Sequence, residues 1–145
     1  MIPKMGIDQA NRSLSSKLQK VTGDMRGNVD TAYRVYVSAH NTNERALETA
    51  RNTAQRARDS RDNDARNSYK QASNTPGERG SWEAYDTAKI TNQQLQEQEN
   101  THSKETFDNA EVRAEEDYRQ TRNKILSHFK EAVTIEVDAF TEAHP

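Results

Sequence analysis

The sequence has 145 residues, of which 31% are hydrophobic and 30% charged, with a net charge of −2 and a mean hydropathy of −1.20. So few apolar residues exclude a large globular core, and the slightly acidic balance makes nucleic acid an unlikely partner. The absence of cysteine excludes disulfides and thiol chemistry. With only three prolines and five glycines, the composition predicts helices that bury a thin seam instead of a disordered chain.

Residues 1–7 are expected to form a loose or docking tail, and they lack the apolar run of a secretory signal peptide. No stretch of the sequence approaches the roughly 18 apolar residues of a membrane-spanning helix. Localisation therefore stays open. A cytoplasmic protein, a protein secreted without a signal peptide and a virion component all agree with the sequence.

The first predicted helix covers about residues 8–74, with Asp8 as its N-cap. Its apolar residues recur every three or four positions, which places them on one helical face. Gly23 and Gly27 interrupt this stripe, so the helix is expected to be continuous or kinked there. The alternative is a short helix over 8–22 followed by a long one over 28–74. We favour one path, because the apolar spacing keeps its phase through both glycines.

A turn is predicted over residues 75–81, where Pro76 ends the first helix and Gly77 and Gly80 allow a reversal. A second helix follows over about 82–140. Its segment 93–103 is so polar that it is expected either to fray or to need a second chain. The sequence thus predicts a single elongated domain over residues 1–145.

Folding the chain at Gly77–Glu78 brings matching stretches together. Two apolar-rich stretches, 14–37 and 118–140, then face each other, with Tyr36 near Gln120. The basic-leaning stretch 44–70 likewise faces the acidic stretch 83–119. The predicted fold class is therefore all-α, a long, coiled-coil-like antiparallel helical hairpin. It is expected to be oligomeric, because two helices alone enclose no core.

Two sets of residues are predicted to hold the hairpin together. The seam is expected to contain Leu14, Leu18, Val21, Met25, Val29, Tyr36, Tyr118, Ile125, Phe129 and Ile135. An aromatic clasp beside the turn is expected to contain Tyr69, Trp82 and Tyr85.

The sequence predicts no catalytic residue, no cofactor-binding or metal site and no small-molecule substrate site. The sequence has no Gly-rich phosphate loop and no nucleophile elbow. The four histidines are expected to lie far apart in a hairpin. None is expected to have a carboxylate or histidine partner at the i+4 spacing of a helical metal site. Asp59, Asp62 and Asp64 alternate like the start of a calcium loop, but the required Gly and closing Glu are missing. The protein is therefore predicted not to be an enzyme.

The runs Tyr85-Asp86-Thr87-Ala88-Lys89 and Ala114-Glu115-Glu116-Asp117-Tyr118 resemble helices of BAR-superfamily domains, over about residues 67–140. The resemblance implies a crescent-shaped dimer that binds or bends membranes through basic side chains. BAR domains have three long helices, whereas this sequence predicts two. The residues that would contact an anionic surface are Arg51, Arg58, Arg61, Arg66, Lys70 and Arg79.

In architecture the chain also resembles small helical hairpins exported by specialised bacterial secretion systems, which carry a Trp near the turn, as Trp82 is here. The sequence most favours a non-enzymatic structural or interaction protein that acts by self-association, as an assembly subunit, filament subunit or scaffold. Its expected partner is a further copy of itself, with another helical protein as a second option. Membrane binding and specialised secretion are the alternative functions.

Overall fold

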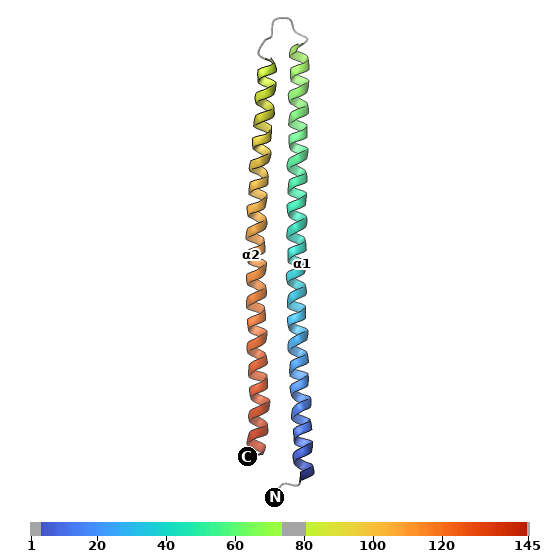
Figure 1. Cartoon of the computed structure of the whole chain (residues 1–145), viewed down its shortest axis with the longest axis vertical. Helices are drawn as coiled ribbons and strands as arrows, with labels where there is room; N and C mark the ends of the chain where they lie inside the picture. Colours follow the sequence, from blue (N-terminus) through green and yellow to red (C-terminus); the bar gives the residue numbers. More distant parts are fainter. Residues whose placement is uncertain (1–3, 74–80, 145) are drawn as a thin grey trace. The chain divides into compact units, whose positions relative to one another are not determined.

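The computed structural model describes residues 4–73 and 81–144, which form two helices. Helix α1 covers Lys4–Ser73 and helix α2 covers Ser81–Ala143, and they pack as an antiparallel hairpin with no strand in the described ranges (Figure 1). All three prolines, Pro3, Pro76 and Pro145, lie outside the two helices. Uninterrupted helices of this length are possible because no interior position lacks a backbone N–H.

The helices differ from the predicted ones mainly at their outer ends. Helix α1 begins at Lys4, so the loose tail predicted over residues 1–7 and the N-cap at Asp8 are both wrong for the described residues. Helix α2 continues to Ala143, three residues beyond the predicted end. The predicted turn falls almost entirely on residues 74–80, which lie outside the described ranges.

Gly23 and Gly27 lie within α1 and do not end it. Both are exposed, and a Cβ atom added at either position would meet no atom within 4 Å. The alternative of two separate helices in this region is therefore wrong. Backbone hydrogen bonds continue through both positions, although glycine is a poor helix former.

Replacing Gly23 or Gly27 by alanine is therefore expected to stabilise the protein by about 1 kcal/mol each, because alanine restricts the unfolded chain and fits the helix without a clash. Urea unfolding followed by circular dichroism at fixed protein concentration measures the change. A loss of stability in either variant would contradict this explanation and would indicate that the glycine itself is needed.

The polar segment 93–103 is helical throughout. Its two hydroxyl groups, and that of Thr106 just beyond it, donate to the carbonyl four residues earlier on the same helix. Thr101 Oγ1 lies 2.8 Å from Glu97 O, and Ser103 Oγ lies 2.8 Å from Glu99 O. The expectation that this segment frays is therefore wrong. Glu99 of this segment also pairs with Arg61 of α1, with 3.2 Å between the two charged groups.

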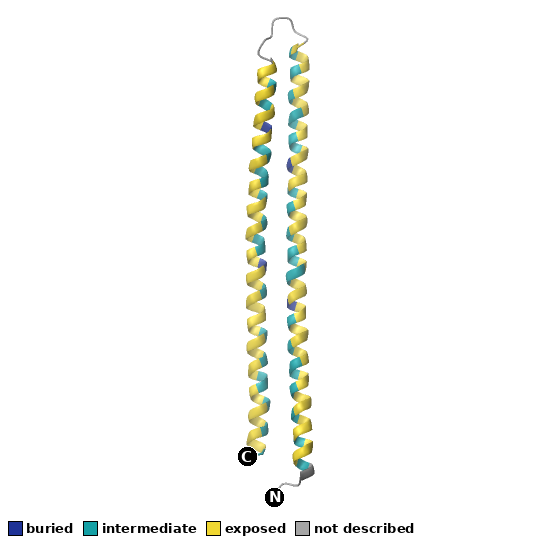
Figure 2. Ribbon diagram, in the orientation of Figure 1, coloured by how far each residue is buried: buried dark blue, intermediate teal, exposed yellow. Residues whose placement is uncertain are grey.

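The chain divides into two compact units. Unit 1 contains Met1–Ala39 and Arg113–Pro145, and unit 2 contains His40–Val112. In each unit a stretch of α1 lies beside a stretch of α2, and the less exposed residues gather on the facing sides of the helices (Figure 2). Among the described side chains, those classed as buried are Ala32, Ala54, Ala114 and Asn92.

The pairing of the helices differs from the predicted register by two residues. In unit 1, Tyr36 contacts Tyr118, not the neighbourhood of Gln120. In unit 2, Tyr69 lies opposite Tyr85, which follows the same register. The predicted direction of pairing is confirmed, with this small shift.

Neither described helix contains a stretch that combines the length and the apolar character needed to cross a bilayer. This result follows from the thin apolar stripe, since charged residues recur along every turn or two of both helices.

Candidate functional site

An aromatic cluster joins the helices of unit 1. The ring centroid of Tyr118 lies 5.6 Å from that of Tyr36 and 6.0 Å from that of Tyr33. The guanidinium carbon of Arg122 lies 5.8 Å from the centre of the Tyr118 ring. Tilted and edge-on ring pairs of this kind add to the stabilisation from buried area. Tyr118 is therefore the central aromatic contact of the unit.

The other residues expected in the seam lie mostly between the helices of unit 1, where they are half-buried. Ile135 differs, because 65% of its surface is exposed. Its neighbour Glu136 lies toward α1, where its carboxylate is 3.8 Å from Lys17 Nζ. One residue turns a helix by about 100°, so Ile135 points away from the contact with α1. The half-buried members are Leu14, Leu18, Val21, Met25, Val29, Tyr36, Tyr118, Ile125 and Phe129.

Two of the three residues expected in the clasp stack on each other in unit 2. The rings of Tyr69 and Tyr85 lie 5.3 Å apart with an interplanar angle of 30°. Lys89 Nζ lies 5.6 Å from the centre of the Tyr85 ring. Trp82 is 58% exposed and makes no ring contact with another described residue. Its position one turn before Tyr85 leaves it beside the stacked pair.

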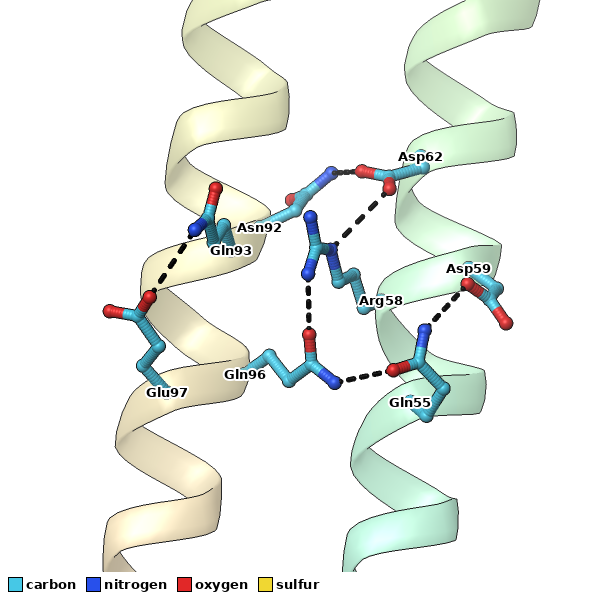
Figure 3. Close-up of polar contacts among 8 residues, drawn as sticks. All are labelled: Gln55, Arg58, Asp59, Asp62, Asn92, Gln93, Gln96 and Glu97. Carbon is cyan, nitrogen blue, oxygen red and sulfur yellow. Dashed lines mark hydrogen bonds and ion pairs between the residues drawn. The ribbon is translucent and has the colours of Figure 1, made fainter.

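A layer of polar side chains crosses unit 2 where a coiled coil would normally bury apolar ones. Asn92 is buried and donates from Nδ2 to Asp62 Oδ1 at 3.0 Å (Figure 3). Asp62 also pairs with Arg58 through Nε of the guanidinium group. Nη1 of the same group donates to Gln96 Oε1 at 2.8 Å. Gln96 then donates to Gln55 at 2.7 Å. We call these five residues the polar layer.

The basic residues expected to contact an anionic surface fall into two groups. Arg58 belongs to the polar layer, and Arg61 lies 3.2 Å from Glu99 across the hairpin. Arg51, Arg66 and Lys70 are exposed. Arg79 lies outside the described residues. Contact of this set with an anionic surface remains a prediction.

A cluster around His40 was not predicted from the sequence. Its Nδ1 lies 2.7 Å from Glu111 Oε2 on α2, and its Nε2 lies 3.1 Å from Glu44 Oε1 on α1. Asn43 Nδ2 donates to the other oxygen of Glu111 at 3.1 Å. Glu44 is four residues after His40, so the expectation that no histidine has such a partner was wrong. The Glu111 contact needed the correct register to be found.

These contacts change the titration of both partners. The hydrogen bond to the Glu111 carboxylate raises the pKa of His40 above its ordinary 6.5, and the charges of Glu111 and Glu44 raise it further. The hydrogen bonds from His40 and Asn43 lower the pKa of Glu111 below its ordinary 4.5. The pair can therefore be charged on both sides and bridge the two helices in mildly acidic solution.

We expect stability to depend on pH through this pair. The raised pKa of His40 means that its contribution is complete below about pH 6.5 and is lost as pH rises through the folded-state pKa. The lowered pKa of Glu111 means that its contribution is present above about pH 4.5 and is lost as pH falls further. The pair should therefore stabilise the hairpin most between these values.

The measurement is the difference in unfolding free energy between the wild type and His40→Gln, taken from pH 5 to pH 8. This difference should shrink as pH rises, because glutamine does not titrate. His102→Gln is the matched control, since His102 is an exposed histidine of the same unit. A pH-independent difference for His40→Gln would count against the charged bridge.

In the described part of the chain, no three His, Asp or Glu side chains come together as a group that could hold a metal ion. Comparisons with protein-family models, with curated proteins and with solved structures each found no match. One candidate docking feature is the open apolar groove of unit 1, which is lined by Ala32, Val35, Tyr36, Ala114, Tyr118 and Ile125 among others.

Proposed function

We propose that this chain is a non-enzymatic structural or interaction protein that works by self-association. The smallest assembly is a homodimer in which two hairpins form a four-helix bundle. The observation that carries the proposal is how little the hairpin buries. The buried side chains of the described residues are three alanines and one asparagine, and no large side chain is fully buried.

The surface area supports the same proposal. The chain exposes 11155 Å², whereas a compact monomer of 16.5 kDa would expose about 7,600 Å² by the usual scaling with mass. The excess is roughly 3,600 Å², several times the ~800 Å² that each partner buries in a standard interface. A second copy has ample surface to cover.

Exposed apolar side chains give this association a driving force. Val35 and Ile135 each expose about two thirds of their surface. Covering such groups is worth about 25 cal/mol per Å². A monomer would not gain this free energy, because its own seam is thin and these side chains stay in water.

Thermal unfolding at several protein concentrations tests this proposal. Association that favours the folded state makes the midpoint rise with concentration, by mass action. We expect a clear rise in Tm over about a hundredfold range of concentration. A midpoint that does not move over this range would overturn the proposal.

A further inference from the structure

A continuous groove runs along one side of unit 1 between the two helices. Its larger part, about 410 Å³, has Ala32 and Ala114 among its lining residues. A second part of about 220 Å³ shares Asn28 and Ile125 with the first. Small side chains in the lining let another helix approach closely.

Exposed apolar residues border this groove on both helices. Val35 of α1 lines it and is 64% exposed. On α2, Thr121 and His128 line it seven residues apart. Ile135 lies another seven residues on, so it falls on the same side of α2, because residues seven apart lie about two turns apart. Ile135 therefore extends the apolar surface beside the groove along α2.

The charge of the helices indicates what fits there. Helix α1 carries thirteen basic and eight acidic residues, a net charge of +5, and α2 carries seven basic and fourteen acidic residues, a net charge of −7. Each unit alone keeps this difference in sign, with a basic stretch of α1 and an acidic stretch of α2. A second hairpin is therefore complementary in charge to the first when its acidic α2 lies beside the basic α1 of the first copy.

We propose that a second copy of this chain docks on the groove of unit 1, with its acidic α2 beside the basic α1 of the first copy and its α1 beside the first α2. This inference rests on the proposed self-association and specifies its surface. Each helix then has neighbours of opposite charge within and between chains. Such charges favour one orientation over its alternatives more than they add affinity.

The variant Val35→Glu tests the surface. A charge at this position would be desolvated in the dimer, so we expect the association to weaken about 100-fold or more. The hairpin itself should stay folded, because Val35 is exposed in one chain and glutamate is the better helix former. Ile135→Glu places the same charge on the same side of α2 and should have the same effect.

Val112→Glu is the matched control. Val112 is 66% exposed, the same residue type with nearly the same exposure as Val35. It lies two residues before Ala114, about 200° around the helix, so it points away from the groove side of α2. Molar mass by sedimentation equilibrium, with helicity by circular dichroism, is measured for the wild type and the three variants.

The expected result is a dimer for the wild type and Val112→Glu, and helical monomers for Val35→Glu and Ile135→Glu. If the wild type and both groove variants are dimers, the surface is wrong while self-association stands. If Val112→Glu alone becomes monomeric, the partner docks on the opposite side. A monomeric wild type overturns the proposed function and, with it, this inference.

Discussion

Replacing Tyr118 by alanine is expected to lower the free energy of unfolding by about 2–3 kcal/mol, which is less than the ~3–5 kcal/mol of buried aromatic truncations because the side chain is only half-buried. The ring contacts Tyr33 and Tyr36, and Arg122 lies over it. Its removal takes away the main large contact between the helices of unit 1. Urea unfolding at one fixed protein concentration measures the loss.

Tyr118→Phe is the matched control for this prediction. It keeps the ring and removes only the hydroxyl group, so its effect should stay below about 1 kcal/mol, the typical net value of one hydrogen bond. A similar loss for both variants would show that the hydroxyl group matters more than ring packing. A negligible loss for Tyr118→Ala would contradict the role given to the cluster.

Replacing Asp62 by alanine is expected to cost about 1–3 kcal/mol, because a buried polar group left without its partner loses hydration without compensation. The group concerned is the amide of Asn92, which donates to Asp62 and is buried between the helices. Arg58 would lose its ion pair in the same variant. The same unfolding experiment measures this effect.

A double-mutant cycle with Asn92→Ala shows whether the two side chains act together. If they do, the double variant should be more stable than the sum of the two single losses predicts, by about 0.5–3 kcal/mol. Asp64→Ala is the control, since Asp64 is an exposed aspartate of the same helix. Additive losses for Asp62 and Asn92 would contradict the polar layer.

The hairpin could be predicted from the sequence because its signals repeat along the chain. Spacings of three and four residues recur through both helices, and matching apolar stretches lie at similar distances from Gly77–Glu78. Because the pattern repeats many times, misplacing a single residue does not change the predicted fold. Register is less constrained, and the pairing of Tyr36 with Tyr118 differs from the prediction by two residues.

Features that depend on one exact pairing could not be predicted. Asn92 is polar, and nothing in its local sequence distinguishes it from the neighbouring exposed glutamines Gln93 and Gln94. Its burial follows from lying opposite Asp62. Ile135 shows the reverse case, since an apolar residue one position from the contact face remains exposed.

The His40 cluster had a local signal that was missed. Glu44 follows His40 by four residues, the spacing at which helical side chains meet. Glu111 comes from the other helix, and its approach depends on register. Half of this cluster was therefore predictable, and the half that bridges the helices was not.

The most direct test of self-association is the molar mass of the intact chain in solution, by size-exclusion chromatography with light scattering. We expect at least twice the chain mass of 16.5 kDa, with dissociation on dilution. A mass of 16.5 kDa at every concentration would contradict the account, because the exposed apolar groove of unit 1 would then have no second copy to cover it.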